Sequence, residues 1–228
     1  MSSFLEQYGK AIFILVLVAI LIAFAGPLGM KIKNATTEKV STTEEIGNDE
    51  VYVATTGRPK PPKTAVDKVY CIYYEDGELT ISQNEIEPEV GRTVVQKGFY
   101  DKPNDCTREM TTARFVGAVM PKTCFQWLSY CGKLTEIKNI ENLYTNECIN
   151  MRQMFYNCQC LKNVDISEFD VTSYTSMSLM SEMFYDCNSF KEKSIKISKS
   201  TYDKIVELKG SNTFFSFIGK EESFFDIK

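Results

Sequence analysis

The chain has 228 residues, 25% of them charged, and a formal net charge of −4. This weakly negative balance does not favour nucleic acid as a partner. The sequence contains no histidine, so it lacks the commonest general base and the commonest metal ligand. Catalysis by a Ser-His or Cys-His pair is therefore excluded.

A hydrophobic segment near the N-terminus is the first predicted element. Residues 11–30 carry no charge, and at helical rise they reach about 30 Å, the thickness of a bilayer core. This length predicts a transmembrane helix that anchors the protein, in a domain of residues 1–33, and it places residues 34–228 outside the cell. A secretory signal peptide is the competing interpretation, because residues 23–25 read Ala-Phe-Ala, the small-x-small form of a cleavage site. Cleavage after Ala25 would release a secreted protein.

Residues 34–65 are predicted to be an extended linker. The first part, residues 34–50, is polar, acidic and rich in threonine, and it has too few apolar residues to build a core. The second part reads GRPKPPK at residues 57–63, and its three prolines favour a stiff, extended chain.

A small β capping region is expected over residues 66–121. Residues 69–74 read VYCIYY, a β-branched and aromatic run typical of a strand, and residues 79–81 read as the partner strand. An Asp-Gly dipeptide lies between them, and this pair favours a hairpin turn. Two further short strands are predicted, at residues 92–100 and 114–121.

One phrase occurs twice in the second half of the chain. Residues 151–161 read MRQMFYNCQCL and residues 180–190 read MSEMFYDCNSF, and a fainter copy, WLSYCGKL, precedes them at residues 127–134. The copies recur at intervals of 27 and 29 residues, a period typical of leucine-rich-repeat solenoids. We expect two to three such repeats over residues 122–198, followed by a C-terminal cap over residues 199–228.

Each repeat is expected to contribute one short strand. The candidates, at residues 134–137, 161–166 and 194–197, alternate apolar and polar residues as strands with one buried face do. Neighbouring repeats would pair these strands into a parallel ladder, with methionine, phenylalanine and cysteine side chains filling the space behind it.

The chain has eight cysteines, and three of them follow the repeat. Cys131, Cys158 and Cys187 occupy equivalent positions, which predicts a row of small, buried, reduced thiols. No two pairs have zinc-ligand spacing, so neither a metal nor another cofactor is expected. Two other pairings remain open as disulfides, because sequence does not fix connectivity: Cys71 with Cys106, and Cys124 with Cys148.

The segment LYTNECINMRQMFYNCQCLKNVDISEFDVTSYTSM at residues 143–177 resembles the repeat of BspA-like leucine-rich-repeat surface proteins. VDISEFD at residues 164–170 is similar to the middle of that family's unit, and residues 151–161 carry its M-x-x-M-F-x-x-C-x-x-L ending. The resemblance extends over about residues 67–228, although longer members have more repeats. It implies a bacterial cell-surface protein with a binding or adhesive role.

Together these elements predict an α+β protein with an N-terminal transmembrane helix, a small β cap and a short leucine-rich-repeat solenoid. The expected function is that of a membrane-anchored extracellular binding or adhesion module, whose partner is a protein or glycan of a host or neighbouring cell. The alternative is a pilin-like subunit that assembles through its N-terminal helix. Glu6 and Tyr8 support it, because acidic and aromatic residues precede the hydrophobic run in some small pilins.

Candidate site residues are few, and no catalytic or metal site is assigned. The binding residues stay unknown at this point. Four tyrosines could form an aromatic patch, namely Tyr144, Tyr156, Tyr174 and Tyr185. Because Tyr156 and Tyr185 occupy equivalent repeat positions, an ordinary packing role is an equal alternative for them. A carboxylate pair for acid–base chemistry is the other candidate, from Glu136, Asp165, Glu168 and Asp170. Because Asp165 and Asp170 occupy repeat positions where turn roles are the default, an enzyme is not expected.

Overall fold

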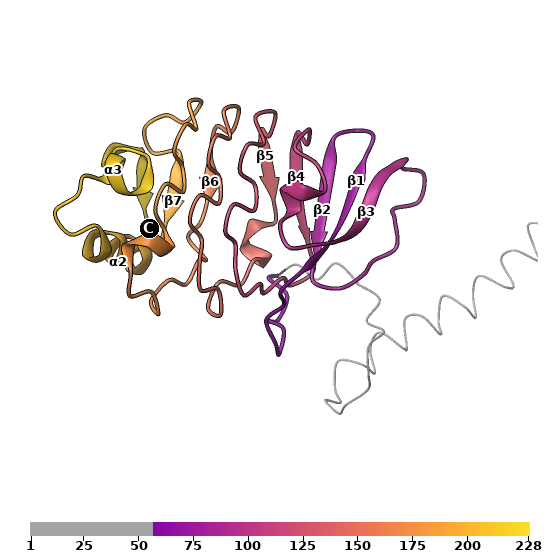
Figure 1. Ribbon diagram of the computed structural model, residues 1–228, viewed down its shortest axis with the longest axis horizontal. Helices are drawn as coiled ribbons and strands as arrows, with labels where there is room; N and C mark the ends of the chain where they lie inside the picture. Colours follow the sequence, from indigo (N-terminus) through magenta and orange to yellow (C-terminus); the bar gives the residue numbers. More distant parts are fainter. Residues whose placement is uncertain (1–56) are drawn as a thin grey trace, which may run out of the picture. The chain divides into compact units, whose positions relative to one another are not determined.

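The computed structural model describes residues 57–228, whose strands and turns lie side by side as a stack of coils (Figure 1). Five strands, β1 (Val69–Tyr74), β2 (Glu78–Ser82), β3 (Val94–Tyr100), β4 (Thr112–Val116) and β5 (Glu136–Lys138), form one sheet in the order β3-β1-β2-β4-β5. β1 pairs antiparallel with β2 and β3, whereas β2, β4 and β5 run parallel. The sheet is therefore of mixed direction, and its parallel part leads into the repeats.

The predicted hairpin is present between β1 and β2, and Gly77 forms its turn. Gly77 has a φ of +88°, a conformation that side-chain-bearing residues rarely adopt. Its carbonyl accepts the Thr111 N–H at 2.8 Å, and a Cβ atom on Gly77 would lie 2.7 Å from Thr111 Oγ1. Glycine thus allows the close approach that brings β4 beside β2.

Ion pairs among five charged side chains hold the loop before β3 against the sheet. Arg92 in this loop donates to Asp76 at 2.7 Å, to Glu78 at 2.9 Å and to Glu89 at 3.0 Å. Arg114 on β4 donates to Glu78 at 2.8 Å and also to Glu89. Glu78 lies at the centre, with only 13% of its side chain exposed.

Backbone hydrogen bonds run in parallel between successive coils of the repeat region. N–H groups of residues 124–130 donate to carbonyls of residues 150–156, and those of residues 151–157 donate to residues 179–185, at 2.7–3.1 Å. Equivalent residues of the three copies have φ of 57–62°: Gln126, Tyr130, Gln153, Asn157, Glu182 and Asp186. This left-handed backbone bends every coil at the same place, so most of each copy forms turns rather than strand.

The C-terminal end of the stack carries a second sheet and two helices. β6 (Val164–Asp165), β7 (Ile195–Ile197) and β8 (Phe225–Ile227) pair in parallel. α2 (Lys199–Lys209) and α3 (Phe214–Ile218) lie beside this sheet (Figure 1). Four short 3-10 turns complete the described elements: η1 (Pro103–Asp105), η2 (Ile140–Asn142), η3 (Met177–Leu179) and η4 (Glu222–Phe224).

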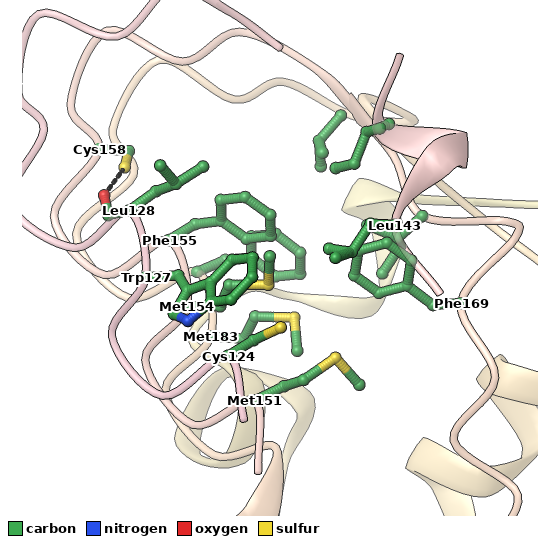
Figure 2. Close-up of a cluster of buried hydrophobic side chains, with 14 of the residues drawn as sticks. Cys124, Trp127, Leu128, Leu143, Met151, Met154, Phe155, Cys158, Phe169 and Met183 are labelled. Carbon is green, nitrogen blue, oxygen red and sulfur yellow. Dashed lines mark hydrogen bonds between the residues drawn. The ribbon is translucent and has the colours of Figure 1, made fainter. Parts of the chain in front are cut away.

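One continuous hydrophobic core fills the coils from the first sheet to the C-terminal end. Figure 2 shows its centre, where Trp127, Met154 and Phe155 pack together. Trp127 is 1% exposed, and the ring of Phe155 stacks on that of Phe184 with centroids 5.5 Å apart. The repeated Met, Phe and Cys positions are therefore core positions.

The fold class predicted from the sequence is wrong. The expected β cap and the expected repeats share one mixed sheet, because β4 from the cap pairs with β5 from the first repeat. Helices are few and short in residues 57–228, and none of them is long and apolar enough to cross a bilayer. The predicted helix at residues 11–30, on which the pilin-like alternative also depends, lies outside the described residues. The described part is a mixed sheet with parallel strands that continues into stacked turns.

Candidate binding surface

The structure separates the four tyrosines proposed as a patch. Tyr174 is buried, with 2% of its surface exposed. The guanidinium carbon of Arg58 lies 3.9 Å from the ring centroid of Tyr144. The Tyr144 hydroxyl donates to the Pro59 carbonyl. Neither residue belongs to an exposed patch. Only Tyr156 and Tyr185 lie together, with their rings stacked at 5.6 Å and an interplanar angle of 12°.

Two further side chains extend this pair into a line, which we call the aromatic row: Tyr130, Tyr156, Tyr185 and Phe215. The Tyr130 ring lies 5.3 Å from that of Tyr156, and the Phe215 ring lies 6.0 Å from that of Tyr185. Tyr130 and Phe215 are each 46% exposed and Tyr185 is 36% exposed. Tyr156 between them is half-buried, so the aromatic row crosses three coils and α3 as a partly exposed line.

The backbone of the coils sets the spacing of the aromatic row. The Tyr130 N–H donates to the Tyr156 carbonyl at 2.7 Å, and the Asn157 N–H donates to the Tyr185 carbonyl at 2.8 Å. Because these bonds hold neighbouring coils in register, the rings of Tyr156 and Tyr185, which occupy equivalent places in their copies, stack upon one another. The repeat thus sets the 5.6 Å spacing between these two rings.

Phe215 joins the aromatic row because α3 lies directly against the last repeat copy. The Phe184 N–H donates to the Ile218 carbonyl at 2.9 Å, so α3 takes the place of a further coil. Gly219, with a φ of +90°, ends α3 where a Cβ atom would lie 2.4 Å from the Tyr185 nitrogen. Only glycine fits between α3 and this coil without displacing one of them.

A second line of side chains crosses the same coils, and hydrogen bonds link its members from one coil to the next. Lys102 donates to Gln126 at 3.1 Å, Gln126 donates to Gln153 at 2.7 Å, and Gln153 donates to Glu182. Arg152 also donates to Glu182, at 3.4 Å. Because these polar groups already bind one another, we expect a partner to contact the aromatic row instead.

Neighbouring groups cover ring faces in the middle of the aromatic row. Tyr156 lies between Tyr130 and Tyr185, and the Arg108 guanidinium lies 5.6 Å from the Tyr130 centroid. The pKa of the Tyr156 hydroxyl is raised by desolvation, by the neighbouring tyrosines and by the carboxylate of Asp186. The hydroxyl is therefore protonated at neutral pH and can donate a hydrogen bond. The strip can therefore offer apolar edges and hydrogen bonds to one partner.

The four candidate carboxylates each have a separate structural partner. Glu136 faces Lys138 at 3.7 Å, Glu168 accepts from Arg58 at 2.8 Å, and Asp170 accepts the Thr172 N–H at 3.0 Å in a turn.

Asp165 accepts from Ser167 and from Lys228, the latter at 3.0 Å. Burial raises the pKa of Asp165, but these hydrogen bonds outweigh it and the net pKa is lowered. A charged, paired Asp165 fits a structural role better than acid–base catalysis.

All eight cysteines are free thiols, and only Cys160 is exposed. The prediction for Cys131, Cys158 and Cys187 is confirmed, because each is completely buried and unbridged. The Cys158 thiol donates to the Leu128 carbonyl at 3.0 Å (Figure 2), and Cys187 donates to Phe155 at 3.0 Å. Within residues 57–228 no cluster of three or more His, Cys, Asp or Glu side chains could hold a metal ion.

Sequence reasoning missed Tyr130 and Phe215. Tyr130 lies one place later in its copy than the position of Tyr156 and Tyr185, so alignment of the copies does not select it. Phe215 belongs to a helix that carries no copy of the phrase. Its signal is the FF-x-F run at residues 214–217, which exceeds what one buried helix face requires.

A family model described as "Mycoplasma protein of unknown function, DUF285" matches residues 125–213. Neither the curated proteins nor the solved structures give a match to the chain. The BspA-like resemblance therefore stays a prediction. Over its repeats and α2, less than half of its length, the chain is similar to a family whose function is unknown.

Proposed function

We propose that residues 57–228 are a non-catalytic module that binds a protein partner outside the cell along the aromatic row. The observation that carries this proposal is a continuous line of four rings across neighbouring coils, of which three are exposed and one, Tyr156, is half-buried. Tyrosine and phenylalanine are enriched in the cores of protein interfaces, because they supply contact area at low entropic cost.

A protein partner fits the aromatic row better than a glycan. Aromatic residues that hold sugars present an open ring face, whereas Tyr156 and Tyr185 turn a face toward each other and Arg108 lies over the ring of Tyr130. Exposed edges and hydroxyls suit apolar side chains and backbone carbonyls of a protein surface. The row is also narrow, so one copy would bind weakly and several copies on one surface would bind by avidity.

The location of the module outside the cell is part of the same proposal. The charge-free run at residues 11–30 supports export, whether it is retained or cleaved. The BspA-like phrase at residues 143–177 supports a cell-surface setting.

The test compares the full-length chain with a variant in which Tyr156 and Tyr185 are both replaced by serine. Each is tetramerised on streptavidin and applied to arrays of purified extracellular-matrix proteins, bacterial surface proteins and glycans. Loss of two central aromatic anchors should weaken binding to the protein partner about tenfold or more. The matched control is Phe99→Ser, because Phe99 on β3 is 49% exposed but lies outside the aromatic row.

Two results would contradict the proposal. One is retention on glycans alone, which would make the partner a sugar. The other is equal binding by the parent, the double variant and the Phe99→Ser control, which would remove the aromatic row from the interaction.

A further inference from the structure

The outermost strand of the first sheet has an edge that pairs with no other described strand. β3 is the last strand in the order β3-β1-β2-β4-β5, and it lies at the end of the stack opposite α2 and α3 (Figure 1). Within residues 57–228, β3 pairs only with β1, and no backbone group of residues 94–101 is hydrogen-bonded to another segment. The N–H and C=O groups that point away from β1 are therefore available to a further strand.

β3 lacks most of the features that protect a sheet edge from pairing. Protected edge strands are usually very short, or they contain proline or a bulge. β3 has seven residues, more than any other described strand, and it contains no proline. Its irregular pairing with β1 falls at Tyr74 and Val94, so residues 96–100 form a regular segment. This segment can accept a partner strand along its whole length.

The side chains that face away from the main core on this edge are exposed. Phe99 is 49% exposed, and its ring contacts that of Tyr70 on β1 edge-to-face at 5.0 Å. Lys97 and Asp101 lie two residues before and after Phe99, so the three side chains share one face of the strand. Asp101 lies 3.6 Å from Lys68, but both side chains are more than half exposed, and such an ion pair is weak.

This pattern is self-complementary when two copies of β3 run antiparallel. A twofold axis at Phe99 places Phe99 opposite Phe99 of the second copy, and it places Lys97 of each copy opposite Asp101 of the other. Aromatic pairs and opposite-charge pairs at directly opposed positions stabilise a sheet, whereas like charges destabilise it. An axis at Lys97 would instead oppose two lysines, so the charges favour the register centred on Phe99.

The other face of β3 is compatible with the same register. Gly98 would lie opposite Tyr100 of the second copy. A Cβ atom on Gly98 would lie 3.6 Å from the ring of Tyr100 in its own strand, and that ring packs against the hydrophobic core. Because Gly98 carries no side chain, both tyrosine rings can lie on this face without a side chain at position 98 between them.

We propose that β3 is a dimerisation edge, which pairs antiparallel with β3 of a second copy of this chain and joins two five-stranded sheets into one. A second copy is the occupant that fits, because the Lys97–Asp101 pair then forms twice and Phe99 meets its own equivalent. One strand pair is smaller than a standard interface of about 1,600 Å², so self-association should have a dissociation constant of roughly micromolar or weaker.

Charge reversal in the full-length chain, purified in detergent, tests the proposal. Lys97→Asp opposes two carboxylates across the axis, and Asp101→Lys opposes two ammonium groups. Each variant alone should self-associate at least about tenfold more weakly than the parent in sedimentation velocity. An equimolar mixture of the two variants restores both opposite-charge pairs, so it should associate as the parent does. Lys162→Asp is the control, because it makes the same change of charge at an exposed position outside this sheet.

Cross-linking tests the register separately. Cysteine replaces either Phe99 or Val95 in a Cys160→Ser background, because Cys160 is the exposed native thiol. Position 99 lies beside its own equivalent at the axis, whereas the two copies of position 95 lie about 27 Å apart along the strands. A short bismaleimide should therefore join two copies through position 99 and not through position 95, which is 58% exposed in the parent.

Thermal melting of each variant shows that it is folded. The proposal fails if the parent chain does not self-associate, if the mixture stays as weak as either variant alone, or if position 95 cross-links as readily as position 99. Self-association that none of the β3 variants changes would place the contact elsewhere and would also overturn it. These outcomes are independent of binding at the aromatic row, because streptavidin sets the number of copies in that experiment.

Discussion

At the residue scale, Glu78 shows how one partly buried charge holds two elements together. It accepts from Arg92 in the loop before β3 and from Arg114 on β4. Burial raises the pKa of Glu78, but the hydrogen bonds from the two arginines outweigh it and the net pKa is lowered. The folded protein therefore holds Glu78 charged at a lower pH than the unfolded chain does.

This difference predicts how stability depends on pH. Because the folded pKa of Glu78 is depressed, its contribution is fully present above the unfolded value of about 4.3 and is lost as the pH falls through the folded value. Replacing Glu78 by Gln should lower the free energy of unfolding by about 1–3 kcal/mol at pH 7. The difference in free energy of unfolding between the variant and the parent should become smaller below about pH 4. Urea unfolding at several pH values measures this difference. Glu136→Gln, at an exposed glutamate on β5, is the control. An equal difference at pH 7 and pH 3 would contradict the electrostatic explanation.

At the element scale, the position of α3 depends on a single glycine. Gly219 ends the helix where a Cβ atom would collide with the Tyr185 backbone, and it has a positive φ. Gly91 has a similar φ of +83°, but open space surrounds its Cβ position. The Gly91→Ala variant therefore measures only the free-energy cost of a positive φ at alanine. The Gly219→Ala variant measures that cost together with the collision against the Tyr185 backbone.

We expect Gly219→Ala to destabilise the protein by about 1–3 kcal/mol more than Gly91→Ala, since overpacking adds to the backbone strain. Thermal melting of the two variants measures this difference. Movement of α3 should also release Phe215 from the aromatic row, so binding of the protein partner should weaken. Equal melting temperatures for the two variants would show that α3 does not need this close approach.

Elements with a local signal could be predicted, and those fixed by distant packing could not. The hairpin follows from a strand-forming run beside Asp-Gly, and the structure places β1 and β2 there. The strand predicted at residues 161–166 is present only as β6 (Val164–Asp165), because left-handed turns take up much of each copy. α2 lies in the expected C-terminal cap, for which no helix is predicted, although a signal is present: the Ser198 side chain accepts the Thr201 N–H as an N-cap.

The candidate site was predicted only in part, for the same reason. The repeat places Tyr156 and Tyr185 at one position, and the structure stacks them. Tyr174 is also a tyrosine, but its side chain points into the core. A single sequence does not reveal that direction.

At the scale of the whole molecule, the proposed function requires residues 57–228 to face the outside of the cell. Protease added to intact cells should then digest this region, and peptides from it should appear in the supernatant. A cytosolic enzyme of the same cells serves as the control for leakage. Survival of residues 57–228 on intact cells, followed by digestion after lysis, would contradict the proposed location.

Trp127 gives the molecule a built-in optical reporter. It is the single tryptophan of the chain, it is 1% exposed, and its indole N–H is buried without a hydrogen-bond partner among the described residues. An indole in such a dry environment emits at short wavelength, and contact with water shifts its emission to longer wavelength. Fluorescence can therefore follow loss of packing between the coils as a red shift, without any attached dye.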